Sequence, residues 1–139
     1  GFAVENGKFA DDVLRATGGR GVDVVLELVG GGYVGEDLSC CAPQGRIVLV
    51  GLMAGVRGEL DLGLILRKRL VLMGTQLRAR ALGEKIEVTR TFERHVVPLV
   101  ESGALQPIVE RVMPVAEAAA AHQAMASNEG FGKIVLAVN

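Results

Sequence analysis

Hydrophobic residues in the first eighty positions form short runs, and glycines separate these runs from stretches with helical spacing. Three runs are predicted to be strands: 22–29, 46–50 and 70–77. Three stretches are predicted to be helices: 10–17, 33–41 and 62–68. The first run is nearly all apolar, which is typical of a strand buried on both faces of a parallel sheet. Apolar strands joined by helical crossovers predict an α/β fold with a partial Rossmann-like, doubly wound parallel sheet.

The pattern changes in the second half of the chain. A long amphipathic helix is expected over 83–101, and Pro98 inside it predicts a kink or an early end. Strands are expected over 108–113 and 133–138, with an alanine-rich helix over 115–127 between them. The two halves are therefore organised differently.

Composition and charge narrow the possible partners. The 139 residues are 50% hydrophobic and 22% charged, which suits one compact domain and not a disordered chain. The net charge of −1 gives no electrostatic reason to expect nucleic acid or an anionic membrane as partner. No apolar run approaches the ~20 residues of a membrane-spanning helix. The first residues resemble no secretion signal, and the chain lacks an initiator Met, which fits a fragment or a processed product.

The two cysteines, Cys40 and Cys41, are adjacent. A disulfide between neighbours is strained and closes no useful loop, so we expect both thiols to be reduced and the compartment to be cytoplasmic. The distant histidines His95 and His122 supply too few ligands for a zinc site, and no metal site is predicted. Both cysteines are expected to pack as small apolar residues at a helix end.

Glycines follow two of the predicted strands, at Val29–Gly32 and at Gly51–Gly55. In open α/β sheets, ligands bind just beyond the carboxyl ends of the strands, where glycine lets the backbone approach them closely. Each segment is equally consistent with an ordinary turn. The Leu52–Met53 step would suit a flat apolar ligand that takes its polar contacts from the backbone.

Polar and basic residues follow the third predicted strand, from Gly74 to Arg80, and Lys133 begins the last one. They could meet a phosphate or a carboxamide, or they could be solvated surface groups. The spacing assembles no catalytic triad, Cys–His pair or carboxylate pair. No catalytic residue is therefore assigned from the residues alone.

Four segments, taken in order, resemble the zinc-free quinone oxidoreductases of the medium-chain dehydrogenase/reductase superfamily. They read GVDVVLELVGG, GRIVLVGLM, LVLMGTQLRAR, and IVERVMPV followed by a GKIVL ending, at 21–31, 45–53, 70–80 and 108–136. Each motif alone is weak, but four in the family's order and spacing are specific and cover nearly the whole chain. The LRAR form is similar to the subgroup of the tumour-suppressor-inducible quinone oxidoreductase.

The resemblance implies an enzyme that passes hydride from NADPH, or from NADH, to a quinone or a related conjugated carbonyl compound. In such an enzyme Val29 and Gly30 line the adenosine side of the cofactor. The other residues implied to bind it lie by the nicotinamide or reach it from the last strand: Gly51, Leu52, Met53, Thr75, Gln76, Leu77 and Lys133. The cofactor carries the chemistry, so no catalytic acid or base is implied.

The resemblance also implies that the family's phosphate-binding glycine turn, its NAD/NADP selector and its GroES-like catalytic domain precede Gly1. We therefore expect a C-terminal fragment that is inactive by itself. Residues 1–80 would be the C-terminal half of the dinucleotide-binding domain, and 81–139 would return to the catalytic domain. Strands 108–113 and 133–138 would then lack their partner strands. Thr75 and Gln76 depart from the residues common in the family.

Two alternatives remain open from the sequence. One is an enoyl reductase of the same superfamily, and the other is a non-enzymatic α/β module that binds or assembles through exposed strand edges. In either case Leu70–Leu77 is expected to be the outermost strand of the sheet. An apolar edge strand needs a partner, so we predict a homodimer in which this strand pairs with its copy.

Overall fold

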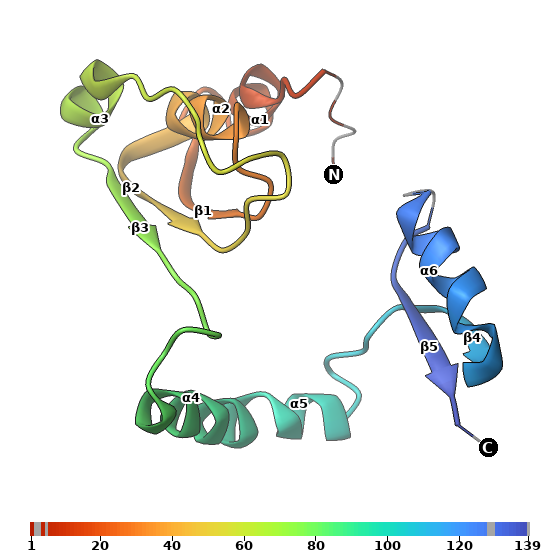
Figure 1. Ribbon diagram of the computed structural model, residues 1–139. Coiled ribbons are helices and arrows are strands. Elements are labelled where there is room, and N and C mark those ends of the chain that lie inside the picture. The colour runs from red at the N-terminus through yellow and green to blue at the C-terminus, as the bar shows by residue number, and fades with distance from the viewer. Residues whose placement is uncertain (2–3, 5, 128–129, 139) are drawn as a thin grey trace. The chain divides into compact units, whose positions relative to one another are not determined.

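The computed structural model describes residues 1, 4, 6–127 and 130–138. The chain divides into two compact units, Gly1–Arg80 and Ala81–Asn139. Each unit is described by itself, with the helices and strands labelled as in Figure 1.

The first unit is a three-stranded parallel sheet with helical crossovers, as the sequence predicts. Its elements are α1 (Ala10–Ala16), β1 (Val22–Glu27), α2 (Tyr33–Cys40), β2 (Cys41–Leu49), α3 (Leu62–Lys68) and β3 (Val71–Gly74). The strand order is β1-β2-β3, and both pairings are parallel. The three helices lie on one side of the sheet (Figure 1). The architecture is Rossmann-like, and β3 forms one edge of the sheet.

The core of this unit lies between the sheet and its helices. Val25, Ile47 and Leu72 stand side by side on the three strands. Ile47 is fully buried and packs with Leu38 of α2, and Val25 and Leu72 pack against the same cluster. Successive side chains of a strand point to opposite faces of the sheet. Every second residue, counted from this row, therefore points toward the helices.

The opposite face of the sheet differs from its prediction. Val24, Leu26 and Leu28 were expected to be buried, but all three are exposed, Leu26 by 65%. The prediction of a strand buried on both faces is therefore wrong for the described residues, because α1, α2 and α3 cover only one face (Figure 1). Both faces of β1 carry hydrophobic side chains, and the helices cover one of these two faces.

The strand ends also differ from the sequence-based boundaries. β1 stops at Glu27, because the carboxylate of this residue accepts the backbone N–H groups of the next residues and turns the chain. β2 begins at Cys41, five residues early, because Cys41 pairs with Val22 across a register shift. β3 ends at Gly74, which pairs with Leu49, the last residue of β2, so the two strands end level with each other.

The second unit is built from helices and one strand pair. Its elements are α4 (Leu82–His95), α5 (Val97–Glu101), β4 (Val109–Pro114), a 3-10 turn η1 (Val115–Glu117), α6 (Ala118–Ala126) and β5 (Lys133–Ala137). The predicted helix is indeed interrupted, with Pro98 in the first turn of α5. Strands β4 and β5 pair with each other in parallel and form a separate two-stranded sheet. Within the described ranges, no helix has the length and apolar character needed to cross a membrane.

Candidate functional site

A concave region of about 540 Å³ lies where β2 and β3 end. Its lining residues are Leu49, Val50, Gly51, Leu52, Gly74, Thr75 and Gln76. Ligands of open parallel sheets bind beyond the carboxyl ends of the strands, which is where this region lies. Four of the nine residues that the resemblance implies, Gly51, Leu52, Thr75 and Gln76, are brought together here, on one apolar wall and one polar wall.

The turn after β1 and the loop after β2 are locked together by backbone contacts. The N–H of Ala54 donates to the carbonyl of Val29, at 2.7 Å, and the N–H of Gly31 donates to the carbonyl of Gly55, at 3.1 Å. Gly30 and Gly55 form an isolated parallel bridge. The two segments therefore hold each other in place beside the concave region.

Glycine is required in both segments by the packing of the chain itself. Gly30 has φ +74°, and a Cβ there would lie 2.8 Å from the Gly55 carbonyl oxygen and from Leu52 Cδ2. A Cβ on Gly51 would lie 2.6 Å from the carbonyl oxygen of Leu28. These close contacts explain both glycines without a ligand, so a ligand site must be argued from the concave region and not from the glycines.

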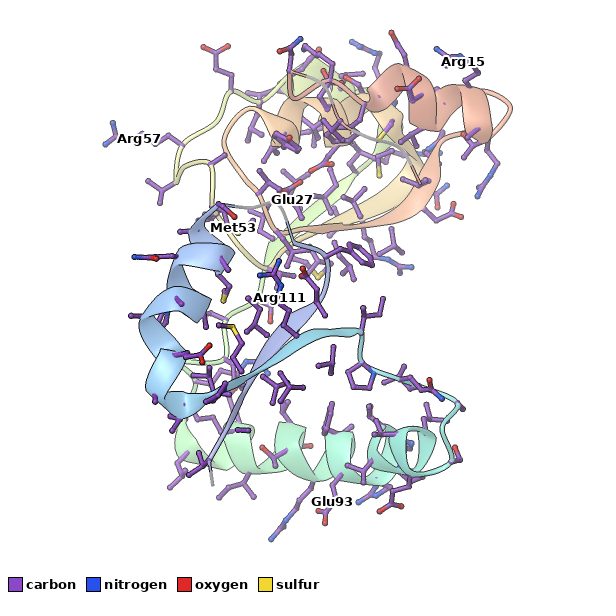
Figure 2. All side chains as sticks on the ribbon, turned by 90° about the vertical axis from the view of Figure 1, so that its right-hand side faces the viewer. Arg15, Glu27, Met53, Arg57, Glu93 and Arg111 are labelled. Carbon is purple, nitrogen blue, oxygen red and sulfur yellow. The ribbon has the colours of Figure 1, made fainter. Side chains whose placement is uncertain are left out.

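The remaining predicted residues do not line the concave region. Val29 is half-buried in the turn, and Met53 is 83% exposed on the loop after β2. Figure 2 shows Arg57, four residues later, extending outward from this loop. Leu77 is exposed beyond the end of β3. Lys133 lies in the second unit, exposed at the first residue of β5, where its N–H donates to the carbonyl of Ile108.

Arg80 holds the polar wall. Its Nη2 donates to Thr75 Oγ1 at 3.0 Å, and its Nε donates to the carbonyl oxygen of Gln76 at 3.1 Å. The guanidinium group thus links Arg80, at the end of the segment beyond β3, to Thr75 and Gln76 at its start. The sequence suggested a phosphate or carboxamide partner for the basic residues here and gave no indication of this internal contact.

A pair of buried acids lies behind the turn after β1. Glu27 and Asp37 are 4% and 1% exposed. Glu27 Oε1 accepts the N–H groups of Val29 and Gly30, the latter at 2.5 Å. Burial, the contact with the Glu27 carboxyl group and the charges of Glu27 and Glu36 together raise the pKa of Asp37 to about 8. Sequence analysis missed this pair.

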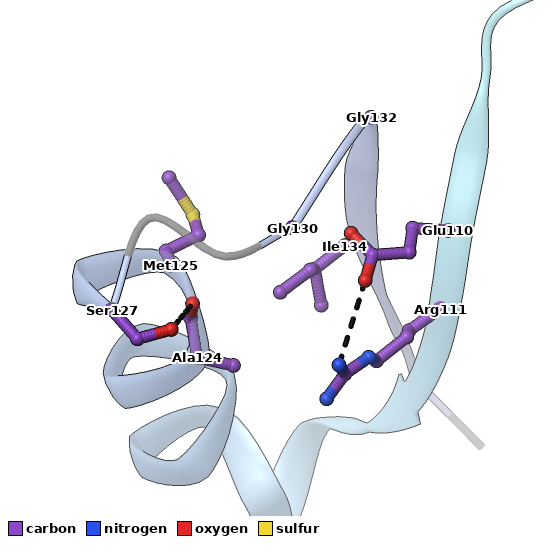
Figure 3. A pocket seen from close by; sticks show the side chains of 8 residues that line it. All are labelled: Glu110, Arg111, Ala124, Met125, Ser127, Gly130, Gly132 and Ile134. Atoms are coloured by element: carbon purple, nitrogen blue, oxygen red, sulfur yellow. Dashed lines mark hydrogen bonds and ion pairs between the residues drawn. The ribbon is translucent and has the colours of Figure 1, made fainter. Parts of the chain in front are cut away.

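A second concave region, of about 300 Å³, lies in the other unit between β4, β5 and α6 (Figure 3). Its lining residues are Glu110, Arg111, Ala124, Met125, Ser127, Gly130, Gly132 and Ile134. Arg111 Nη2 lies 3.5 Å from Glu110 Oε1, so the two charges largely offset each other. None of the predicted site residues lines this region.

The sequence matches the zinc-binding dehydrogenase family over residues 3–136. It is 33% identical, over 99% of its length, to a highly reducing polyketide synthase of Cordyceps militaris. It is 32% identical, over 92% of its length, to a 2-haloacrylate reductase of Burkholderia sp..

Solved structures share the fold. A mycobacterial protein complexed with NADPH matches 97% of this chain with a TM-score of 0.77 at 25% identity. The chain spans 5% of the polyketide synthase, 38% of the haloacrylate reductase and 42% of the mycobacterial protein.

Proposed function

This chain belongs to the zinc-binding dehydrogenase family of oxidoreductases, and we propose that the whole enzyme, to which this chain contributes the nicotinamide side of the site, transfers hydride from NADPH to a quinone or another conjugated carbonyl compound. One observation carries the proposal: the concave region beyond β2 and β3 has the composition that a nicotinamide ring needs. Leu49, Val50 and Leu52 offer an apolar surface, while Thr75 and Gln76 offer polar groups to a carboxamide.

The residues of the site act by positioning. The dinucleotide, when bound, supplies the hydride. Gly51 and Leu52 would support one side of the ring, and the segment fixed by Arg80 would hold the other. The proposal assigns Val29 and Gly30 to the adenosine side, Met53 to the nicotinamide and its ribose, and Leu77 to the nicotinamide carboxamide. Holding the ring against the acceptor lowers the barrier by orientation alone, so the proposal needs no catalytic acid or base from this chain.

The choice of NADPH rests on the mycobacterial structure, which is complexed with NADPH. NADH is the alternative cofactor. Comparing the two dinucleotides in the assay below decides between them.

The residues described here do not fit zinc, in spite of the family's name. Burial raises the pKa of the Cys40 thiol to about 11 and also raises that of Cys41, whereas zinc binds the thiolate. In the described ranges, no three His, Cys, Asp or Glu side chains are grouped as a metal site would require. We therefore derive no step through zinc. Two free, buried thiols also support our proposal of a cytoplasmic location.

Gly74→Val tests the cofactor site. Gly74 lines the concave region, and a Cβ there meets no atom within 4 Å, so the larger side chain fills the site without disturbing the fold. In the whole enzyme, we expect NADPH binding and NADPH-dependent quinone reduction to fall at least about tenfold, because a steric clash that costs more than ~1.4 kcal/mol lowers the affinity by that factor. Gly35→Val in α2, where a Cβ also meets open space, is the matched control. Equal NADPH affinity in both variants would place the cofactor elsewhere.

Reduction of an activated carbon–carbon double bond is the second candidate. It is favoured by the 32% identity to a protein named for reducing 2-haloacrylate, a conjugated alkene. The cofactor site would be the same, and only the acceptor would differ. Steady-state assays with a quinone, an acrylate and an enoyl thioester, each with NADPH, separate the two candidates by kcat/KM.

We also propose a homodimer through β3, which lies at an edge of the sheet. Val71 and Met73 are exposed on this strand, and an unpaired apolar edge favours association. Met73→Lys should therefore halve the mass measured by light scattering, since a lysine on an edge strand discourages pairing. Leu62→Lys, at an exposed position of α3, should leave the mass unchanged.

A further inference from the structure

Two buried carboxyl groups from different elements, those of Glu27 and Asp37, interact behind the turn after β1. Glu27 ends β1 on the same face as Val25, which the alternation of the strand directs toward the helices. Asp37 lies in the middle of α2 and is almost completely buried. The strand-to-helix crossover therefore brings two acids, ten positions apart in sequence, into one enclosed place.

The two acids are bonded differently. Glu27 accepts two backbone N–H groups, those of Val29 and Gly30, and thereby fixes the turn. Asp37 Oδ2 is buried without a hydrogen-bond partner. An ionised carboxylate can only accept hydrogen bonds, and burying it unpaired costs several kcal/mol. A proton on Asp37 makes it a donor and relieves the repulsion between the two acids.

The charged groups around the pair offer no alternative partner within the described residues. Glu36 of α2 is bound to Lys8 and to the N–H groups of Phe9 and Ala10, which hold its pKa at about 2. Lys68 of α3 donates to three carbonyl oxygens at the junction of α2 and β2.

The other charged groups near these elements are engaged or remote. The thiols of Cys40 and Cys41, at the junction of α2 and β2, have raised pKa values and stay neutral. On α1, Arg15 pairs with the exposed Asp12. Asp23 of β1 pairs with Arg20. Figure 2 shows Arg57 directed outward from the loop after β2.

We propose that Asp37 is a positioning residue of the dinucleotide site: protonated, it donates a hydrogen bond to Glu27, and so lets Glu27 hold the Val29–Gly30 turn. The proposal rests on the proposed function, because this turn is locked to the loop that lines the concave region. Asp37 touches neither the dinucleotide nor the acceptor and acts through Glu27 alone.

The pKa of Asp37, raised to about 8, sets the pH range of the effect. The folded state keeps this proton up to about pH 8, whereas an unfolded Asp loses it near pH 4. Between these values the folded state binds more protons, so stability declines as pH rises, until Asp37 ionises. Above about pH 8 Asp37 is ionised and can no longer donate to Glu27, so the turn that Glu27 holds should loosen.

The main test compares NADPH binding by wild-type protein and Asp37→Asn across this pH range. If only the protonated form holds the turn, wild-type affinity should fall about tenfold for each pH unit above the Asp37 pKa. The Asn side chain donates permanently, so Asp37→Asn should bind like wild-type protein below that pH and lose the decline above it. Asp12→Asn, at an exposed position, is the matched control and should keep the wild-type profile.

A purely structural role predicts something else, namely a change in affinity that is equal at every pH. Asp37→Leu, which packs but cannot donate, should bind weakly at all pH values. The proposal is overturned if Asp37→Asn and wild-type protein share one pH profile, or if Asp37→Leu binds like wild-type protein.

Two measurements without nucleotide separate this proposal from the proposed function. Infrared difference spectra between wild-type protein and Asp37→Asn should show a protonated carboxyl at neutral pH, and urea unfolding of Asp37→Asn should lose the decline in stability between about pH 4 and 8. If both appear but folded protein binds no dinucleotide at any pH, the cofactor assignment fails and the positioning role fails with it, while the shared proton stands. If neither appears, the shared proton is refuted even where NADPH binds.

Discussion

The two units of this chain differ most in what they bury. Eight of the nine buried hydrophobic residues among those described lie in the first unit, and Ala121 alone lies in the second. The first unit has a sheet packed against helices, whereas the second is a long exposed helix and a strand pair beside α6. Both units thus contain regular helices and strands, but among the described residues a buried core that holds a site in place is found in the first unit.

This difference predicts how each unit responds to loss of an apolar side chain. Ile47→Ala removes a fully buried side chain at the centre of the sheet and should lower the free energy of unfolding by about 2–5 kcal/mol. Val112→Ala, on a β4 residue that is 65% exposed, should change it by less than about 0.5 kcal/mol. Urea unfolding followed by circular dichroism measures both. Similar losses would mean that Val112 is buried in the protein as it exists in solution, and the contrast would fail.

Glycines with the same backbone conformation sharpen the contrast. Gly30 and Gly103 have φ of +74° and +72°, so an alanine at either position carries a strain of about 1–2 kcal/mol. At Gly30 the new Cβ also meets the Gly55 carbonyl oxygen at 2.8 Å, which should add about 1–3 kcal/mol. At Gly103 the nearest atom is the flexible end of Gln106, at 3.5 Å.

Gly30→Ala should therefore lower the melting temperature clearly more than Gly103→Ala does. Scanning calorimetry of the two variants provides the comparison. Equal shifts would show that the loop after β2 moves away from Gly30 at little cost, and that the turn is less rigid than its hydrogen bonds indicate.

The sequence predicted the helices of both units well, and the reasons are local. α3 has the predicted bounds, and α1 and α2 end within one residue of theirs. Glycines and helical spacing mark such ends directly. Strand ends were less accurate because they depend on the neighbouring strand, as where the pairing of Cys41 with Val22 extends β2.

The site was predictable only in part, for a related reason. Gly51, Leu52, Thr75 and Gln76 meet because β2 and β3 are neighbours, which the order of elements implies. The facing of Glu27 and Asp37 depends on the exact packing of α2 on β1, which no motif encodes. Each acid by itself has the appearance of an ordinary charged residue. The contact of Arg80 with Thr75 was missed for the same reason.

Arg80 is the last residue of the first unit and gives the smallest effect that we expect. Its two hydrogen bonds hold the polar wall of the concave region, so Arg80→Gln should weaken NADPH binding about fivefold, which corresponds to roughly 1 kcal/mol for hydrogen bonds of this kind. Arg80→Lys keeps the charge but loses the planar fork and should weaken binding by a similar amount. Arg78→Gln, two residues earlier and exposed, should have little effect. If Arg80→Lys binds NADPH like wild-type protein, or if Arg78→Gln weakens binding more than Arg80→Gln does, the basic residues act on the dinucleotide through their charge. The hydrogen bonds of Arg80 would then not be what holds the polar wall in place.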